Sequence, residues 1–397
     1  MTASRAVFLG FTVPDDFARR LFQADPIPSV QTHKFAWSFA SVLGQVFDRV
    51  FLLSAAPVQI FPITPFKSFD ALEFQENGLP GVMLGASNQR LARHASRFVA
   101  CLQFTRRMRR EWTPDVVFVH GVHTPFLACA AFLRLFGIKT IVLLTDAAGV
   151  ILPTDGLLRR SLKKVDRFVV KALLRAANGV VTLAPALADK LAPGKPALVV
   201  PGIISASWQG DVLRLVKDTA NPRFTVTYAG GIEENYGVKV LIEAAALLPN
   251  IDFRVCGRGS YLEKISTIAT ANVTLPGFLD QESVANELMS ADLLLNPRPS
   301  ALDFAALSFP SKLLEYLATG RPVMSTRIPS IPPELEGAFY YITQETAEGL
   351  AKAIQAVADL SKAARDGFGA TAQRQAVDSF GEAAVAEKIL AFWACFR

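Results

Sequence analysis

The feature that most constrains the fold is a series of short, wholly apolar segments. Each is followed by a turn, often with glycine, and then by a helical pattern. In the first half such segments include residues 115–120 and 139–145, and in the second half 224–228, 252–256 and 292–296. Strands that are apolar on both faces are typical of parallel sheets covered by helices on both sides. The alternation predicts an α/β protein with a parallel sheet in each half.

The chain is long enough for two domains. It has 397 residues, of which 51% are hydrophobic, so two sizeable cores can be buried. A polar stretch at 205–221 interrupts the alternation, and we place the domain boundary there. We expect residues 1–205 to form one domain and residues 206–375 a second. Residues 376–397 are predicted to form a helix that crosses back to the first domain.

Charge is shared unevenly between the halves. Residues 1–205 carry a net charge of +11 and the remainder −5, which together give the formal charge of +6. Two predicted helices, 91–112 and 157–177, hold most of the basic excess. The basic half favours either simple solubility or contact with an anionic membrane surface or an anionic acceptor. Nucleic acid is disfavoured as a partner because no aromatic-interleaved basic groove occurs.

The expected compartment is the cytoplasm. No apolar stretch is long and charge-free enough for a membrane span, and the N-terminus does not resemble a signal peptide. The four cysteines are far apart in the sequence, namely Cys101, Cys129, Cys256 and Cys395. This spacing fits reduced thiols rather than zinc ligands or disulfides. We expect a cytoplasmic protein that is at most peripheral on the inner face of the plasma membrane.

The segment 308–322, SFPSKLLEYLATGRP, predicts a short helix with an anion-binding start. Pro310 suits the first turn, and Ser308 or Ser311 suits the N-cap. Lys312 and Glu315 are three residues apart and share one face. The cation and the unpaired N–H groups suit a diphosphate, and the carboxylate can accept hydrogen bonds from ribose hydroxyls. An ordinary capped helix with a solvated ion pair remains the alternative.

Glycines and basic residues follow the predicted strands of the second half. Gly230, Gly231, Arg258, Gly277 and Arg298 all stand where such a strand ends. The carboxyl ends of parallel strands meet at one edge of a sheet, where ligands bind in open α/β folds. Glycine there lets the backbone approach a phosphate closely. Any one such turn is weak support, whereas several in successive units favour a nucleotide site.

Four segments of the second half together carry a family resemblance. They are YAGGIEENYGVKVLIEAAALL, FRVCGRGSYLEKI, VTLPGFLDQESVANELMSADLLLNPRPS and SFPSKLLEYLATGRPVMST. They resemble the C-terminal domain of GT-B glycosyltransferases of family four, which are retaining enzymes that use nucleotide sugars. Within that family the FPSK-x-x-EY segment after NPRPS is most similar to bacterial surface-polysaccharide enzymes. The first half resembles the family more loosely, through PDVVFVHGVHTPFLACAAFLRLFGIKTIVLLTD.

The resemblance implies a fold, a reaction and partners. The fold would be GT-B, with two Rossmann-like domains whose parallel sheets face a central cleft. The reaction would move a sugar from a nucleotide diphosphate sugar to a lipid-linked or oligosaccharide acceptor, with retention of configuration. GT-B enzymes generally need no bound metal, and no Asp-x-Asp motif occurs here. No cofactor beyond the donor is therefore expected.

The resemblance also assigns roles to individual residues. Glu315 would hold the ribose hydroxyls, and Asp146 would lie near the donor sugar. The other implied donor contacts are Gly230, Gly231, Arg258, Gly277, Phe278, Leu279, Ser308, Phe309, Pro310 and Ser311. Weaker candidates on the acceptor side are His120 and His123, for which packing is the competing interpretation.

The sequence departs from the family pattern at the cations. The usual arginine is Gly231 here, and the usual lysine falls on Tyr236. Leu307 and Thr145 replace the first glutamate and the histidine before the aspartate. Because an uncompensated diphosphate in a dry cleft is costly, we hypothesise that Lys312 and Arg298 supply the charge. The competing interpretation of Arg298 is a loop arginine paired with Asp303 or Glu315.

Three other functions stay open or are disfavoured. The absence of a serine elbow motif disfavours a hydrolase. A nucleotide-sugar epimerase shares the expected architecture. A non-catalytic GT-B protein that binds a nucleotide or a partner enzyme is favoured somewhat by the missing cations. The nucleotide base, the sugar and the acceptor are not set by the sequence.

Overall fold

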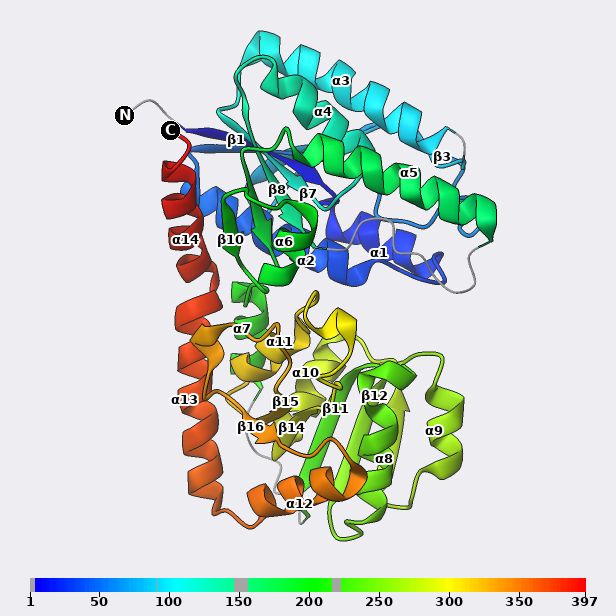
Figure 1. Cartoon of the computed structure of the whole chain (residues 1–397), viewed down its shortest axis with the longest axis vertical. Coiled ribbons are helices and arrows are strands. Elements are labelled where there is room, and N and C mark those ends of the chain that lie inside the picture. The colour runs from blue at the N-terminus through cyan, green and yellow to red at the C-terminus, as the bar shows by residue number, and fades with distance from the viewer. Residues whose placement is uncertain (1–3, 91, 146–155, 216–222) are drawn as a thin grey trace. The chain divides into compact units, whose positions relative to one another are not determined.

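The structure is a computed structural model that describes residues 4–90, 92–145, 156–215 and 223–397 (Figure 1). It divides into two compact units. The first unit comprises Met1–Val200 with Val385–Arg397, and the second comprises Pro201–Ala384. The division after Val200 precedes the polar stretch at which the sequence places the boundary. Part of that stretch is a helix, α7 (Ala206–Arg214), which belongs to the second unit.

The described part of the first unit contains an eight-stranded sheet in the order β10-β9-β8-β7-β1-β2-β5-β4. All neighbouring pairs are parallel except β4 with β5. The strands are β1 (Arg5–Gly10), β2 (Arg49–Ser54), β4 (Leu72–Glu76), β5 (Leu79–Met83), β7 (Val116–His120), β8 (Lys139–Leu144), β9 (Gly179–Thr182) and β10 (Ala197–Val199). A short antiparallel pair, β3 (Ser68–Phe69) and β6 (Ala86–Ser87), lies apart from this sheet.

Helices cover the first sheet because its central strands are apolar on both faces. Every residue of β7 is buried, as the uninterrupted apolar run predicts. The helices of this unit are α1 (Asp15–Gln23), α2 (Val30–Val46), α3 (Arg93–Glu111), α4 (Thr124–Arg134), α5 (Leu157–Leu174), α6 (Pro185–Leu191) and α14 (Glu382–Ala394). Helix α4 packs against both α3 and α5, so these three helices form one layer (Figure 1).

A hairpin extends the first sheet. Strands β4 and β5 are joined by Asn77 and Gly78, whose φ angles are 52° and 75°. Positive φ at both central residues is the requirement of a type I′ hairpin turn, and Asn-Gly is its preferred sequence. This hairpin was not predicted from the sequence, although the Asn-Gly dipeptide was the signal for it.

The second unit contains a six-stranded parallel sheet within the described residues, in the order β13-β12-β11-β14-β15-β16. Its strands are β11 (Thr225–Gly231), β12 (Asp252–Arg258), β13 (Val273–Gly277), β14 (Leu293–Asn296), β15 (Val323–Thr326) and β16 (Tyr340–Ile342). Its other helices are α8 (Val238–Ala246), α9 (Leu262–Ile268), α10 (Gln281–Ser290), α11 (Lys312–Ala318), α12 (Ala347–Ala358) and α13 (Lys362–Phe380). The α/β class with parallel sheets in two domains is therefore confirmed.

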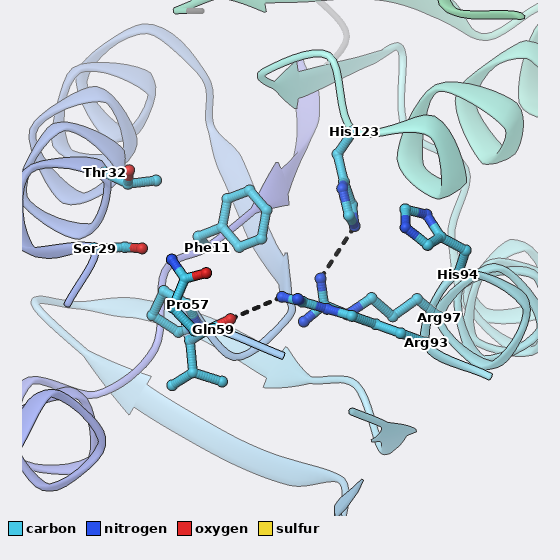
Figure 2. A pocket seen from close by; sticks show the side chains of 10 residues that line it. Phe11, Ser29, Thr32, Pro57, Gln59, Arg93, His94, Arg97 and His123 are labelled. Carbon is cyan, nitrogen blue, oxygen red and sulfur yellow. Dashed lines mark hydrogen bonds between the residues drawn. The ribbon is translucent and has the colours of Figure 1, made fainter. Parts of the chain in front are cut away.

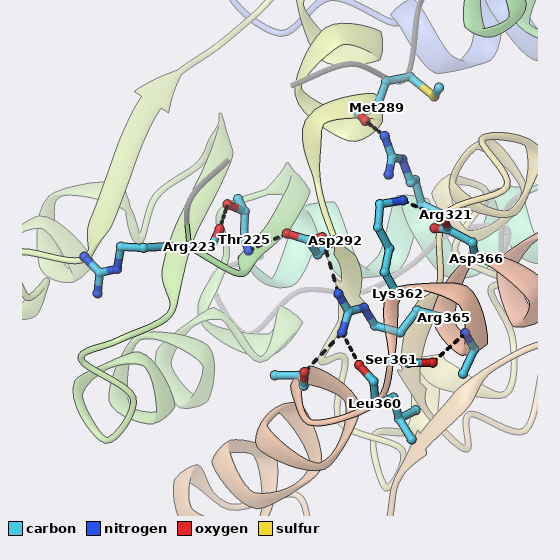
Figure 3. A network of polar contacts seen from close by, with 12 residues as sticks. Arg223, Thr225, Met289, Asp292, Arg321, Leu360, Ser361, Lys362, Arg365 and Asp366 are labelled. Carbon is cyan, nitrogen blue, oxygen red and sulfur yellow. Dashed lines mark hydrogen bonds and ion pairs between the residues drawn. The ribbon is translucent and has the colours of Figure 1, made fainter. Parts of the chain in front are cut away.

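A polar network fastens the second unit at the amino ends of its strands (Figure 3). Asp292, just before β14, accepts a hydrogen bond from the N–H of Thr225 at 3.0 Å and lies 3.8 Å from the Arg365 guanidinium. Arg365 also donates to the carbonyl of Ala358 at 3.1 Å and lies over the Phe224 ring at 4.9 Å. The network links α12 and α13 to the sheet at the edge opposite the glycine turns.

The end of the chain belongs to the first unit. Residues Val385–Arg397 group with it, and the Trp393 ring lies 5.9 Å from that of Phe47. A Cβ added to Gly179 would meet the Phe396 ring at 2.6 Å, so that aromatic ring lies directly on β9. In the described ranges, no helix combines the length and the apolar character that crossing a bilayer requires.

Candidate functional site

Four neighbouring strands of the second unit end at one edge of its sheet, and the glycine turns bring their backbones together. Gly230 pairs with Gly257 and Gly231 with Arg258 in the register of β11 and β12. Gly257 has a φ of +146°, and a Cβ there would lie 1.8 Å from the Gly230 carbonyl oxygen. Only glycine fits this approach. The edge therefore presents bare backbone, as a phosphate site requires.

Helix α11 follows the next strand along the chain and begins at Lys312. Pro310 precedes the helix instead of standing in its first turn. The N-cap, Ser311, has helical dihedrals and makes no side-chain capping bond, so the prediction of a serine cap is wrong. Gly320, with a φ of +70°, follows the last turn as predicted. With 7 residues, α11 has a weak macrodipole, so side-chain charge matters more than predicted.

Two buried hydrogen-bonding side chains fix α11 relative to the sheet. The Tyr316 hydroxyl accepts a hydrogen bond from the N–H of Ala229 at 2.8 Å and donates to its carbonyl at 2.9 Å. Trp208 on α7 donates its indole N–H to the Glu315 carbonyl at 3.1 Å. Because all three bonds are internal to the second unit, the helix is held in place next to the end of β11.

Lys312 and Glu315 face the same side of α11. The Lys312 Nζ lies 4.0 Å from a Glu315 carboxylate oxygen, and the side chains are 32% and 23% exposed. A pair at this separation and exposure is loose, so each charge remains available to a ligand.

Arg298, which follows β14, has no carboxylate partner among the described residues. Its guanidinium lies over the Tyr236 ring at 4.9 Å and the Phe304 ring at 5.3 Å, and it donates to the Ser308 carbonyl at 3.3 Å. Burial lowers its pKa from the ordinary value, with opposing contributions from Tyr236 and Tyr228. Glu315 pairs with Lys312, so the predicted alternative of pairing with Glu315 is wrong, and the side chain of the other predicted partner, Asp303, lies outside the described residues.

The position of Arg298 bears on the missing family cations. It lies on the face of Tyr236, the residue that stands where the family lysine is expected. A Cβ on Gly231, the position of the family arginine, would meet the same tyrosine ring at 3.0 Å. The Arg298 guanidinium therefore lies beside Tyr236, which is itself next to Gly231, and these are the two positions at which the family's lysine and arginine are missing.

An arginine and a phenylalanine, both with planar side-chain groups, lie together where β12 and β13 end. The Arg258 guanidinium is 4.6 Å from the centroid of the Phe278 ring, which is 64% exposed. Planar groups exposed in this way suit stacking against a nucleotide base. Leu279, the next residue, packs instead against the buried core around α11. Gly277, with nothing within 4 Å of an added Cβ, leaves its backbone open to a ligand.

The loop before α11 offers backbone donors. No described residue accepts a hydrogen bond from the N–H groups of Ser308, Phe309 or Ser311. The Ser308 carbonyl, by contrast, is used by Arg298 and by the Ser330 hydroxyl at 3.2 Å. The loop is therefore held through its carbonyl while its amides remain for a ligand.

The predicted residues of the first unit are distributed differently. Asp146 lies outside the described residues. His120 is 1% exposed and stacks against Phe8 at 5.9 Å, so the packing interpretation holds for it. His123 lines a pocket on the same unit. In the described ranges no group of three or more His, Cys, Asp or Glu side chains is arranged to hold a metal ion.

Two functional candidates, Arg93 and Arg97, were not predicted, because they were counted among the basic residues of the predicted helix 91–112. Both line the pocket with His123. Arg97 is in phase with the buried residues Cys101 and Thr105. A charged residue in an apolar stripe at a spacing of four was the signal that could have identified it.

Comparison with family models gives two matches, one in each unit. Residues 49–201 match the glycosyl transferase 4-like domain, and residues 223–359 match glycosyl transferases group 1. Between them the models span most of both sheets.

Two curated bacterial proteins are similar to part of the chain. The putative colanic acid biosynthesis glycosyltransferase WcaL of Escherichia coli K12 is 28% identical over 158 residues, which is 37% of this chain and 39% of that protein. The amylovoran biosynthesis glycosyltransferase AmsK of Erwinia amylovora is 28% identical over 130 residues, 30% of this chain and 32% of that protein. The chain thus matches well under half the length of either relative.

Among solved structures, Alr3699/HepE of Anabaena, crystallised with UDP and glucose, is similar in fold. The TM-score is 0.63 at 14% identity, and the superposition covers 98% of this chain and 99% of that one. At this identity the likeness concerns the fold alone.

Proposed function

This chain belongs to the group 1 glycosyltransferases of GT-B fold, resembling family four, and we propose that it transfers a sugar from a nucleotide diphosphate sugar during exopolysaccharide biosynthesis. The proposed acceptor is a lipid-linked or oligosaccharide hydroxyl, and the proposed stereochemical outcome is retention. The donor class is supported by the nucleotide in the similar Anabaena structure, and the pathway class by the names of WcaL and AmsK.

The observation that carries the proposal is the position of Arg298. It is a partly buried cation with no described carboxylate partner, set against the two positions where the family places its basic residues. A buried, unneutralised guanidinium is costly to maintain unless an anion offsets it. A diphosphate bound at the glycine edge would provide that anion.

The chemistry assigns a role to each group. The bond between the sugar carbon and the diphosphate oxygen breaks, and a bond from that carbon to the acceptor oxygen forms. Negative charge builds up on the diphosphate oxygen as its bond to the sugar breaks, and the acceptor hydroxyl proton passes to the leaving nucleoside diphosphate. Arg298, Lys312 and the free amides of the loop before α11 stabilise that charge. Glu315 binds the ribose hydroxyls, and Arg258 with Phe278 stacks on the base. Fixed charges of this kind are often the largest contribution to catalysis.

The proposal is tested by a nucleotide screen followed by a turnover assay. Thermal-shift measurements against UDP, GDP, ADP, TDP and CMP identify the donor class, because a ligand of the folded state raises Tm. The matching nucleotide sugars are then incubated with lipid-linked and oligosaccharide acceptors. Binding without turnover of any sugar favours the non-catalytic alternative, and interconversion of free nucleotide sugars favours the epimerase. We propose that no metal takes part, which the same assay in EDTA tests.

We also propose that the first unit contacts an anionic membrane surface through α5. This helix exposes Leu162, Val165 and Phe168, with exposed fractions of 58%, 59% and 73%. Lys164 and Lys171 lie on the same helix and are exposed. Apolar side chains flanked by lysines are typical of helices that lie in a lipid interface. Each basic residue near an anionic leaflet contributes about 1 kcal/mol.

A further inference from the structure

The first unit contains a pocket of about 400 Å³ where three adjacent parallel strands end (Figure 2). Phe11 follows β1, residues 57–59 follow β2, and His123 follows β7. The first turns of α2 and α3 complete the lining. Loops at the carboxyl ends of neighbouring strands are where ligands bind in open α/β sheets.

Two arginines of α3 dominate this pocket. Arg97 is 3% exposed. One of its terminal nitrogens lies 3.1 Å from the His123 Nε2 and the other donates to the Ala56 carbonyl at 3.2 Å. Arg93 donates to the Val58 carbonyl at 2.8 Å, and its buried Nε has no hydrogen-bond partner among the described residues. Figure 2 shows both guanidinium groups between the two imidazoles and the loop after β2.

No described carboxylate forms an ion pair with either arginine. Asp25 is near Arg93, but its two oxygens accept hydrogen bonds from the N–H groups of Ile27 and Gln59. Asp166 is near His94, and it accepts a hydrogen bond from the Thr124 hydroxyl at 2.9 Å. The pocket therefore contains two fixed positive charges and no directly paired negative one.

The protein bears a cost to hold these groups together. Burial is the largest cause of the lowered pKa of Arg97, and the neighbouring charge of Arg93 lowers it further. Burial is also the largest cause of the lowered pKa values of His94 and His123, so both imidazoles are neutral at pH 7. A buried guanidinium without a carboxylate is unfavourable, and a second guanidinium beside it adds repulsion. An anion in the pocket removes both costs.

We propose that this pocket binds a phosphate or diphosphate group, held by Arg93 and Arg97 with His94 and His123 as further hydrogen-bonding partners. Two planar guanidinium groups offer several N–H donors at fixed angles, which suits phosphate oxygens better than a single carboxylate. The volume exceeds that of one phosphate and leaves room for an attached group. Assigning this group to the acceptor rests on the proposed function, whereas the anion site itself does not.

The direct test is calorimetric titration of the intact chain with inorganic pyrophosphate. We expect binding by the wild-type chain, at least a tenfold loss of affinity in Arg97→Met and Arg93→Met, and no change in Arg106→Met. Arg106 is an exposed arginine of the same helix and serves as the matched control. Circular dichroism shows whether each variant is folded. Arg93 is only half-buried, so its variant keeps the test valid if Arg97→Met does not fold.

The outcomes separate the site from the proposed function. Absent pyrophosphate binding, or equal binding by the wild-type chain and both pocket variants, would overturn the anion site. If octyl diphosphate binds tenfold more tightly than pyrophosphate, the bound diphosphate is assigned to a lipid-linked acceptor. If the two ligands bind with equal affinity, that assignment is overturned and the site is one for free phosphate. If the chain binds pyrophosphate but turns over no nucleotide sugar, the anion site stands and the proposed function is refuted. In an active chain, Arg93→Met raises the acceptor KM and leaves the donor KM unchanged.

Discussion

At the scale of single residues, we propose that the donor site depends on two cations, Arg298 and Lys312, in place of the family pair. We expect Arg298→Ala and Lys312→Ala each to weaken nucleotide diphosphate binding about tenfold or more, since each removes a charge-assisted contact of about 1.5–3 kcal/mol. Calorimetric titration with the nucleotide identified by the screen measures this. Lys239→Ala is the matched control, because Lys239 pairs with Glu243 on α8 at 3.6 Å. Unchanged affinity in both site variants would refute the replacement.

His120 makes the first unit sensitive to acid. Burial lowers its pKa from 6.5 to about 4, and within the described ranges its buried Nδ1 has no hydrogen-bond partner. Between these two values the unfolded chain binds a proton that the folded chain does not, so stability falls as the pH drops from about 6.5 to about 4. Of the stability lost between pH 7 and pH 5, about 2 kcal/mol is assigned to this residue.

His120→Phe tests this assignment. A phenyl ring fits beside Phe8, Phe11 and Phe35, which surround the imidazole. Urea unfolding at pH 7 and pH 5 should show a smaller loss of stability in the variant. Because the other histidines titrate in both proteins, the difference between the two proteins isolates His120. An identical loss in both would show that His120 is not responsible.

Residue-level prediction succeeded where the chemistry is local. The spacing of Lys312 and Glu315 on a short helix was sufficient to predict their contact. The position of Arg298 on the Tyr236 ring was not predictable, because it depends on two loops joined to different strands. Arg97, which is buried, was counted with the other basic residues of the predicted helix 91–112 because its charge was given more weight than its place in the apolar stripe. Tertiary packing decides such positions, and one sequence does not display it.

At the scale of elements, α11 depends on one hydroxyl. Tyr316→Phe leaves the buried N–H and carbonyl of Ala229 without a partner, which costs about 2–3 kcal/mol. Because the bond sets the position of α11, the donor KM should also rise. Urea unfolding and donor kinetics measure the two effects. Tyr261→Phe is the control, because Tyr261 is a buried tyrosine of the same unit that packs in the separate core cluster around α8. Wild-type stability in Tyr316→Phe would contradict this role.

Helix α5 carries the proposed membrane contact. We expect the triple variant Leu162→Ser, Val165→Ser and Phe168→Ser to lose sedimentation with vesicles that contain phosphatidylglycerol, because it removes the exposed apolar face. Ile268→Ser in the second unit, where the isoleucine is 46% exposed, should leave sedimentation unchanged. If the wild-type chain stays in the supernatant at low salt, the surface contact does not exist.

Element prediction followed the strength of periodicity. The buried strands β7, β8, β11 and β12 lie where apolar runs predict them. Helix α7 was not predicted, because its sequence is polar and mixed and was taken to mark the domain boundary. Its packing onto α11 through Trp208 shows why it forms. The β4–β5 hairpin was missed because its strands are short and its turn dipeptide was passed over. Weakly amphipathic helices and short strands are stabilised by tertiary contacts, and these contacts cannot be predicted from the periodicity of one sequence.

At the scale of the whole molecule, the end of the chain supports the first unit. Trp393 is 3% exposed and packs on Phe47. Trp393→Ala should destabilise the first unit by about 3–5 kcal/mol, the usual cost of emptying a buried tryptophan site. Nucleotide binding by the second unit should not change. Urea unfolding followed by circular dichroism, with titration of the nucleotide, measures both.

Leu390→Ala is the control for that variant, because Leu390 lies on the same helix and is 46% exposed. A Trp393→Ala protein that unfolds at the same urea concentration as wild type would mean that the segment contributes little. Loss of nucleotide binding would mean that the damage is not confined to the first unit.

The placement of Val385–Arg397 has a consequence for synthesis. A ribosome makes residues 1–200 first, yet their partner segment emerges only after the whole second unit has been translated. Until then, the surface around Phe47 and β9 lacks the aromatic side chains that cover it. Nascent chains with such exposed apolar surface are aggregation-prone. Chaperone occupancy on the ribosome is therefore expected to persist until the final helix has been made.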